Sequence, residues 1–355
     1  MTTIPIETRR DVMSRLAALA ESPAGDIPAK LAALYAPDAV WRGAHPLNEM
    51  AGLEAIEETV WAPLLHSFPD LERRDVIFVG GSYEGRDYVA QIGHYCGTFR
   101  KDWLTIPATG RPIYLRYGEV HQIEGGRIVQ SNCLWDILDV MRQAGFWPLA
   151  PSLGTEGLWP GPITTDGIVL TETDPAQSAT SIAQTLAMHG SLAEHDDRAC
   201  LTRESLMTMP QKHYWHPKMM WYGPAGIGTT RGLQGFVDYH QLPFRKALQR
   251  PQGSFEEVMA ARKAHGAGHY IRIGDGPYSV TGGWPSVYAI HNGDNFLGLG
   301  PTGREVTMRV MDFYLHHEGL IRENWVPLDI PHVLLQLGVD VFERMQSHFD
   351  HRPFA

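Results

Sequence analysis

The chain has 355 residues, 43% hydrophobic and 20% charged, so it is long enough to bury a sizeable core and to form two domains. Its formal net charge of −10 argues against a nucleic acid or an anionic membrane as a partner. The three cysteines are far apart and lack metal-ligand spacing, which favours a reduced, cytoplasmic setting, and no apolar run approaches the length of a membrane span.

In the first part of the chain, the spacing of apolar residues predicts helices at residues 32–43 and near 53–65. Apolar and polar residues then alternate at 86–99 and 111–136, which predicts strands. The pair Gly125-Gly126 interrupts the second of these runs, so a hairpin is expected there.

A stretch rich in proline and glycine, residues 148–180, is predicted to be a linker between a domain at 1–147 and a domain at 181–355. Its leucines and tryptophans suggest that it packs on the surface of the protein. The second domain repeats the order of the first. Helices are expected at 202–217 and 233–248, and strands at 304–329 with a break at Glu318-Gly319.

An internal repeat is the most informative feature of the sequence. A shift of 180 residues superposes Trp41 on Trp221 and Gly43 on Gly223. A shift of 193 superposes the tripeptide TGR at 109–111 on the same tripeptide at 302–304, and gives 11 identities between positions 109 and 145. We therefore predict that the chain is a tandem duplication.

The second copy contains TGR, R-x-x-D-F, EG-x-I-x-E-N-W-x-x-x-D-I and QLG, and the first contains GHYCGTF, TGRPI, EVHQIEGGRIV and WDILDVMRQAG. With these motifs both copies, which cover most of the chain, resemble the SnoaL-like polyketide cyclase branch of the NTF2-like superfamily. The resemblance implies an α+β fold of two tandem cone domains, each with helices packed on a strongly curved antiparallel sheet around a cavity. It does not imply one reaction, because this fold hosts isomerases, cyclases, dehydratases, hydrolases and non-catalytic binders.

Two carboxylates occupy the same position of the repeat, Asp312 in the second copy and Glu119 in the first. Strand alternation places Asp312 on one face with apolar residues and with Tyr314. Burial among such neighbours raises the pKa of a carboxyl and suits it to act as an acid or a base. The alternative is a structural carboxylate, paired with Arg309 or Arg116.

Histidines are the second set of catalytic candidates. An alignment with four extra residues in the first copy superposes His94 on His291, each near the end of a predicted strand. A histidine can carry a proton near neutral pH, although a hydrogen-bonded structural role explains the position equally well.

The second copy is richer in aromatic residues near its start. Trp221 repeats Trp41 and is explained by packing. Tyr222, by contrast, replaces Arg42, and Trp215 and His216 have nothing comparable in the first copy, so these three suggest a wall for a flat organic ligand. The candidate ligand-binding residues are Trp215, His216, Trp221, Tyr222, His240, Trp284, Arg309, Tyr314 and Trp325.

Other chemistries find little support. The histidine pairs 213/216 and 265/269 lack a recognisable ligand set, so no metal is expected. The GPAGIG stretch lacks the lysine of a phosphate-binding loop, and no G-x-S-x-G elbow is present. No cofactor is therefore expected.

The sequence favours a cofactor-independent cyclase or isomerase, of the lyase or isomerase class, that acts on a small carbonyl-containing or polyketide-like compound. Asp312 and His291 of the second copy would share the acid and base roles. A hydrolase or dehydratase on the same fold, and a non-catalytic small-molecule binder, are the alternatives.

The duplication predicts an intramolecular pseudo-dimer of the two cones, and association of whole chains into a homo-oligomer is left open. It also predicts unequal cavities. The larger and more aromatic one is expected in the second copy, lined by Trp221, Tyr222, Asp312 and Trp325, and the first copy's cavity is expected to be smaller or filled by its own side chains.

Overall fold

The computed structural model describes residues 4–350, which form two compact units. The first unit holds the described residues up to Trp147, the segment Pro160–Glu172 and the described residues from Phe342 onward. The second unit holds Pro148–Trp159 and Thr173–Val341. The stretch that the sequence presents as one linker, 148–180, is thus divided between the units, and its end already belongs to a helix.

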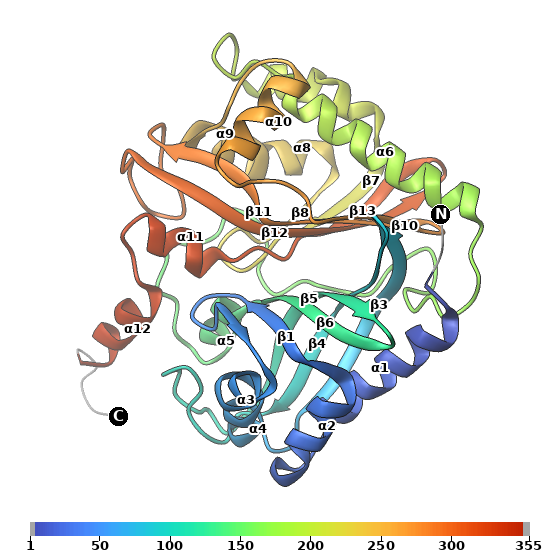
Figure 1. The fold of residues 1–355 in the computed structure, drawn as a ribbon. Coiled ribbons are helices and arrows are strands. Elements are labelled where there is room, and N and C mark those ends of the chain that lie inside the picture. Colours follow the sequence, from blue (N-terminus) through green and yellow to red (C-terminus); the bar gives the residue numbers. More distant parts are fainter. Residues whose placement is uncertain (1–3, 351–355) are drawn as a thin grey trace. The chain divides into compact units, whose positions relative to one another are not determined.

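The first unit is a six-stranded sheet with helices α1 to α4 against one face (Figure 1). The strand order is β2-β1-β6-β5-β4-β3, antiparallel throughout except for the parallel pair β1–β6. The strands are β1 (Tyr35–Gly43), β2 (Glu49–Ala51), β3 (Glu72–Tyr83), β4 (Arg86–Thr98), β5 (Pro112–Glu124) and β6 (Arg127–Trp135). The helices are α1 (Ile6–Ala20), α2 (Ile27–Leu34), α3 (Leu53–Ile56), α4 (Ala62–Ser67) and α5 (Ile137–Gln143), with a 3₁₀ turn at Ala24–Asp26 and a π-helical turn at Glu57–Trp61.

The second unit has the same plan, and its helices α6, α8, α9 and α10 cover one face of its sheet (Figure 1). The strands are β7 (Trp215–Tyr222), β8 (Thr229–Arg231), β9 (Leu248–Gln249), β10 (Ile271–Asp275), β11 (Tyr278–His291), β12 (Arg304–His317) and β13 (Leu320–Trp325). The helices are α6 (Pro175–Ala193), α7 (Arg203–Thr208), α8 (Gly232–Phe236), α9 (Leu242–Ala247), α10 (Phe255–Ala264) and α11 (Ile330–Gln336), with a 3₁₀ turn at Pro210–His213 and a π-helical turn at Val237–Gln241. A last helix, α12, spans Val341–Asp350 and belongs to the first unit from Phe342 onward.

The two sheets confirm the duplication as a repeat of topology. The order β8-β7-β13-β12-β11-β10 of the second unit matches the order of the first strand for strand, including the parallel pair β7–β13. The π-helical turns also occupy equivalent places, since Glu57 and Val237 are 180 residues apart. The fold is therefore α+β, with two tandem domains, as the resemblance implies.

The predicted hairpins are confirmed at Gly125-Gly126 and at Glu318-Gly319, but the helix predicted at 32–43 is wrong from Tyr35 onward, and the helix predicted at 202–217 ends before the strand that begins at Trp215. Residues 35–43 and 215–222 form the strands β1 and β7. Proline cannot sit inside a helix without the loss of a hydrogen bond and a clash, and each of these strands contains one, Pro37 or Pro217. Both prolines fall where the parallel ladder is irregular, so the strands accommodate them.

No helix within residues 4–350 has the length and apolarity that crossing a bilayer requires.

The core of the first unit is aromatic where that of the second is aliphatic. Register equates Tyr95, opposite Leu115, with Val287, opposite Met308. Tyr117 corresponds to Val310, because each lies opposite a glycine, Gly93 or Gly283, of the neighbouring strand. Trp135 corresponds to Leu328, because Trp135 pairs with Tyr117. Leu328 pairs in the same way with Val310.

These aromatic side chains fill the inside of the first unit. The ring of Trp135 lies 5.7 Å from that of Trp41, 6.1 Å from that of Trp61 and 5.3 Å from that of Tyr95. Val287 and Val310 cannot occupy the same volume in the second unit. A cavity there is the expected consequence, because protein interiors are otherwise close-packed.

Replacing Trp135 with leucine should destabilise the protein by about 2–4 kcal/mol, since the change opens a cavity and removes a hydrogen bond to a buried carboxylate. Urea unfolding followed by circular dichroism measures the loss. Tyr114→Leu is the matched control, because Tyr114 is 41% exposed on the same sheet and should change stability by less than about 1 kcal/mol. Equal losses in both variants would contradict this account of the core.

Candidate functional site

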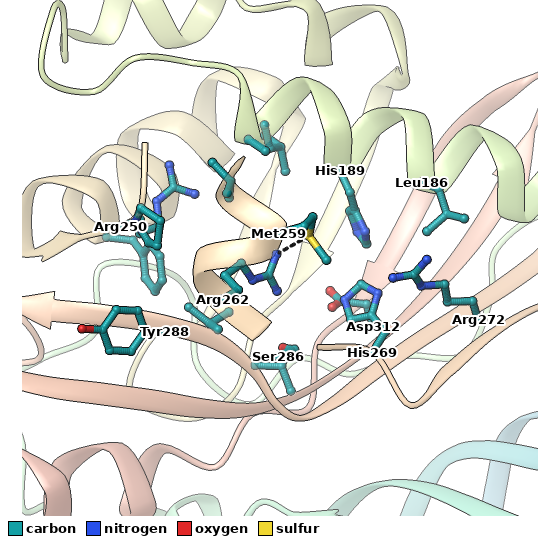
Figure 2. Close-up of a pocket in the computed structure, with 17 residues that line it drawn as sticks. Leu186, His189, Arg250, Met259, Arg262, His269, Arg272, Ser286, Tyr288 and Asp312 are labelled. Carbon is teal, nitrogen blue, oxygen red and sulfur yellow. Dashed lines mark hydrogen bonds between the residues drawn. The ribbon is translucent and has the colours of Figure 1, made fainter. Parts of the chain in front are cut away.

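A cavity of about 340 Å³ lies in the second unit between the helices and the sheet (Figure 2). Its walls come from α6, α9, α10, β10, β11 and β12 and from the segment that follows β9. Its polar lining residues are His189, Arg250, Arg262, His269, Arg272, Ser286, Tyr288 and Asp312. Val287 and Val310, which replace tyrosines of the first unit, also line it. The cavity thus occupies the volume that aromatic side chains fill in the first unit.

Among the residues that the structure describes, Asp312, on the central strand β12, is the one carboxylate that lines this cavity. It has no cationic partner within 4.0 Å among the residues that the structure describes. Burial therefore raises the pKa of the Asp312 carboxyl to about 6, although hydrogen bonds from Asn324 and Tyr314 oppose the shift. A carboxyl with this pKa exchanges protons readily near neutral pH.

A chain of neutral groups leads away from Asp312. The Tyr314 hydroxyl hydrogen-bonds to the Asp312 carboxylate and also lies 2.8 Å from Nε2 of His189 on α6. The His189 ring lies 5.6 Å from the ring of His269. Burial, with nearby Arg262 and Arg272, lowers the pKa of His189 to about 4, so this histidine is neutral at pH 7. If Nε2 carries its proton, the Tyr314 hydroxyl is left to donate to Asp312.

The equivalent carboxylate of the first unit has a different environment. Glu119 accepts from Arg73 Nη1 at 2.8 Å, from Trp135 Nε1 at 2.8 Å and from the Tyr95 hydroxyl at 3.0 Å, and is 1% exposed. His121 Nε2 lies 3.4 Å from it. Burial alone would raise the pKa of Glu119, but Arg73, His121 and Trp135 hold that pKa well below its usual range.

The arginine of this network is itself fully paired. Arg73 also binds Asp75 through two contacts, of 2.9 and 3.2 Å, and Tyr117 donates to Asp75 at 2.7 Å. These partners favour the ionised form of Glu119, which fits the structural role that the sequence left open beside a catalytic one. Its partner is Arg73, and not Arg116, which binds Asp136.

The two candidate histidines do not occupy equivalent positions. His94 lies opposite Arg116 on β5, whereas His291 lies opposite Arg304 at the start of β12. Two extra residues in β11, between Gly283 and Val287, shift the register, so His291 takes the place of Phe99. The alignment of His94 with His291 is wrong for this reason.

Neither histidine can share chemistry with Asp312. The His291 ring hydrogen-bonds to Thr302 and to the Asp294 carbonyl, each at 3.2 Å. Its partner Arg304 lies eight residues from Asp312 along β12, which is about 26 Å at ~3.3 Å per residue. His94 packs against Tyr114 in the first unit, and burial lowers its pKa to about 4.

Most of the aromatic candidates lie away from the larger cavity. Trp325 and Tyr222 pack together, and cross-strand pairing places both on the face of Phe313, which is opposite to that of Asp312. The Tyr222 hydroxyl donates to buried Glu323 at 2.7 Å. The expectation that these two rings line the pocket of Asp312 is wrong, because a one-residue difference in parity turns a side chain to the other face.

The remaining candidates have structural surroundings as well. Trp215 packs on Phe236, and His216 lies near Glu318 at the outer hairpin. The Arg309 guanidinium lies over the Trp284 ring and binds Asp329 at 3.1 Å, at the start of α11. Of the predicted ligand-binding residues, Tyr314 is the one connected to Asp312.

Trp221 packs on His240, which lines a second cavity. Their rings stack at 3.9 Å, and burial lowers the pKa of His240 to about 3. His240, with Phe244 and Phe296, lines a cavity of about 270 Å³, and Phe244 also lines the larger one. This cavity is mostly apolar and holds no carboxylate in its lining.

Sequence reasoning missed His189, Arg262 and Arg272, and noted His269 only as half of a weak metal-binding pair. These residues come from α6, α10 and the start of β10, and no spacing in the sequence connects them. One sequence signal could have located the cavity. The second unit has valines, Val287 and Val310, in the places of Tyr95 and Tyr117. Within residues 4–350, no group of three or more His, Cys, Asp or Glu side chains has an arrangement that could hold a metal.

Asp312 should lower the stability of the protein at neutral pH. Its folded pKa of about 6 exceeds its unfolded value of ~3.9, so the folded state binds the extra proton and stability falls as pH rises between these values. Asp312→Asn should therefore be up to about 3 kcal/mol more stable than the natural protein at pH 7.5, and most of the gain should disappear near pH 4. Urea unfolding at both pH values measures it. Glu318→Gln, at an exposed turn, should show no such gain.

Residues 16–131 match the family model of the SnoaL-like domain. No curated protein matches the chain. A candidate SnoaL-like polyketide cyclase from Jannaschia sp. CCS1 is 19% identical, with a TM-score of 0.34, and the match covers 40% of this chain and 94% of that protein. IdmH, a candidate polyketide cyclase from Streptomyces antibioticus, is 23% identical, with a TM-score of 0.33 and coverages of 39% and 98%.

A protein with a ketosteroid isomerase-like fold from Catenulispora acidiphila is 18% identical, with a TM-score of 0.31, and the match covers 38% of this chain and 92% of that protein. At these identities the likenesses assign no activity to this chain. The match to the family model does not depend on these structural likenesses, and it falls within the first unit. The chain therefore carries a SnoaL-like domain at residues 16–131.

Proposed function

We propose that the second unit is a cofactor-independent acid/base enzyme that acts on a small, enolisable carbonyl compound, with Asp312 as the proton acceptor. The observation that carries the proposal is the contrast between the two equivalent carboxylates. Glu119 is neutralised by Arg73 in a filled interior, whereas Asp312 has no such partner and lines a cavity. A carboxylate without a structural partner, at the wall of an open cavity, is available for chemistry.

The pKa of Asp312 suits a base. At a pKa of about 6, roughly nine tenths of the groups are ionised at pH 7, and the conjugate acid still returns its proton easily. Abstraction of a proton next to a carbonyl gives an enolate, which can be reprotonated at another atom or can attack a second carbonyl. Isomerisation and cyclisation therefore begin with the same step, and Asp312 supports either outcome.

Tyr314 and His189 position the base. With Tyr314 and Asn324 donating to the carboxylate, Asp312 is oriented and keeps further acceptor positions for substrate. Neutral His189 holds the tyrosine hydroxyl at 2.8 Å. His291, which the sequence paired with Asp312, has no part in this arrangement because it lies at the far end of β11.

The volume of the cavity limits the substrate. A cavity of about 150 Å³ accommodates benzene, so about 340 Å³ corresponds to a molecule of one or two rings. This value is near the lower end of the ~300–1,000 Å³ range of small-molecule sites. We therefore propose a monocyclic or bicyclic compound as substrate.

Asp312→Asn should abolish proton abstraction. Small cyclic diketones and aryl ketones would be incubated with the protein in D₂O, and loss of the α-proton signal would be followed by NMR. The variant should slow deuterium exchange by at least ~100-fold, the usual contribution of a positioned general base. Glu318→Gln is the control and should exchange at the natural rate.

Unchanged exchange in Asp312→Asn would disprove the assignment of the base. Tight binding of a ligand that undergoes no exchange and no chemical change would instead indicate a non-catalytic binding protein.

The pH dependence of kcat/KM should rise with pH and show a midpoint near 6, because Asp312 must be ionised to accept a proton. Tyr314→Phe should move this midpoint upward, by up to about one pH unit, since it removes a hydrogen bond that stabilises the carboxylate. Tyr114→Phe, on the first unit, should leave the midpoint in place. A downward shift in Tyr314→Phe would show that the hydroxyl does not donate to Asp312.

A further inference from the structure

The charges that line the larger cavity do not balance. Three arginines, Arg250, Arg262 and Arg272, face a single carboxylate, Asp312. Arg250 has its own partner, because it binds Asp197 at 2.9 Å. Arg262 and Arg272 have no carboxylate within 4.0 Å in the part of the chain that the structure describes. The cavity is therefore positive, although the whole chain carries a formal charge of −10.

The two arginines are poorly satisfied inside the protein. Arg262, on α10, donates to the Met259 sulfur at 3.6 Å, and sulfur is a weak acceptor. The Nε atoms of Arg262 and of Arg272 are buried and have no hydrogen-bond partner among residues 4–350. Burial, with Arg250 and Arg272 nearby, lowers the pKa of Arg262 to about 10, which still leaves it charged at pH 7.

The histidines beside these arginines do not compensate them. Burial lowers the pKa of His269 well below its usual range, and that of His189 to about 4, so both rings are neutral at pH 7. In the view of Figure 2 the Arg262 and Arg272 side chains lie on either side of Asp312, with His189 above. The arrangement is a positive site with one base at its centre.

Strand register gives the spacing of the site. Arg272 lies opposite Thr281, and Thr281 lies opposite Asp312, so the three residues form one row across β10, β11 and β12. Neighbouring strands are about 4.8 Å apart, which separates the backbones of Arg272 and Asp312 by about 10 Å. A ligand that reaches both has two functional groups at opposite ends of about one ring.

The equivalent row of the first unit is Phe78, Gln91 and Glu119, with phenylalanine in the place of Arg272. Arg73, the arginine beside Glu119 in the first unit, forms ion pairs with both Glu119 and Asp75, so its charge is balanced. At this row the second unit thus has an arginine where the first has a phenylalanine, and the row has a single carboxylate in both cases. Holding an uncompensated charge in a partly dry site costs free energy, and a bound anion removes that cost.

We propose that Arg262 and Arg272 bind the carboxylate of an organic acid, whose ring occupies the apolar part of the cavity formed by Leu186, Val258, Val287 and Val310. A guanidinium matches a carboxylate through two parallel hydrogen bonds, and the apolar walls favour an organic acid over an inorganic anion. The inference rests on the proposed function, because the same ligand places its carbonyl next to Asp312.

Binding to matched pairs of compounds tests the proposal without any turnover. Benzoate, phenylacetate, cinnamate and 1-naphthoate would each be titrated by calorimetry against the intact protein, in parallel with their uncharged amides. At least one carboxylate should bind about tenfold or more tightly than its amide, because the amide keeps the shape and loses the charge. Equal affinities within every pair, or no binding of any carboxylate at millimolar concentration, would overturn the proposal.

Substitutions locate the effect. Arg272→Met and Arg262→Met should each weaken carboxylate binding about tenfold or more and leave the amide within about twofold. Arg231→Met, at an exposed position of β8, should change neither affinity. Equal weakening of acid and amide would show that the arginines only shape the cavity, and competition by inorganic phosphate at similar concentration would show an unselective anion site.

The outcome is separable from that of the proposed function. Asp312→Asn should retain or strengthen carboxylate binding, since it removes a negative charge from the site. Charge-selective binding together with unaffected deuterium exchange in Asp312→Asn would leave the acid-binding site standing and disprove the base. Loss of exchange in Asp312→Asn, with no preference for carboxylates, would support Asp312 as the base and disprove the acid-binding site.

Discussion

A buried carboxylate on the central strand of the sheet is the constraint on which both units depend. Such a group must find a cation and hydrogen-bond donors, or must take up a proton more easily, because leaving it charged and alone is costly. The first unit meets the constraint with Arg73 and a set of aromatic donors around Glu119. The second unit leaves Asp312 without a cation, and its pKa rises to about 6. One position of the repeat therefore yields a structural ion pair in one unit and a candidate base in the other.

The size of the neighbouring side chains follows the same division. Tyr95, Tyr117 and Trp135 pack around Glu119 and supply donors to the network, so they cannot shrink without loss of both packing and hydrogen bonds. In the second unit the equivalent positions have only an apolar role, and valine or leucine is sufficient there. The resulting cavity lowers the stability of the second unit, and under the proposed function it gives a ligand room to bind, which is a common compromise at functional sites.

Much of the fold could be predicted from the sequence, because strand alternation and glycine turns are local signals. The long strands β4, β5 and β12 and the hairpins at Gly125-Gly126 and Glu318-Gly319 are examples. The strand β1 and the first residues of β7 were predicted as helix, since their parallel pairing to a distant strand leaves no local pattern. Asp312 could be proposed from the strand alternation and from its shared position with Glu119 in the repeat. The other residues of its site come from separate elements, so they required the three-dimensional structure.

The failure with His94 and His291 has a specific cause. Identity of residue type suggested the alignment, but two extra residues in β11 shift the second unit's register relative to the first. A bulge of this kind changes which side chains face each other without changing composition or periodicity. The prediction that Trp325 and Tyr222 line the pocket of Asp312 is wrong for a similar reason. The sequence does not show which residue of β13 lies opposite Asp312.

The path of the chain between the two units has a practical consequence for dissecting the protein. Residues 148–159 pack on the second unit, where Thr155 pairs with Thr229 and Trp159 donates to Gly223. Residues 160–172 then return to the first unit, where Ile168 pairs with Phe78. A single cut anywhere in this stretch removes a packed segment from one unit or the other. The first unit would therefore need residues 160–172, and the second unit residues 148–159, to be expressed alone with its own packing intact. Each segment could be supplied as part of the same chain or as a separate peptide.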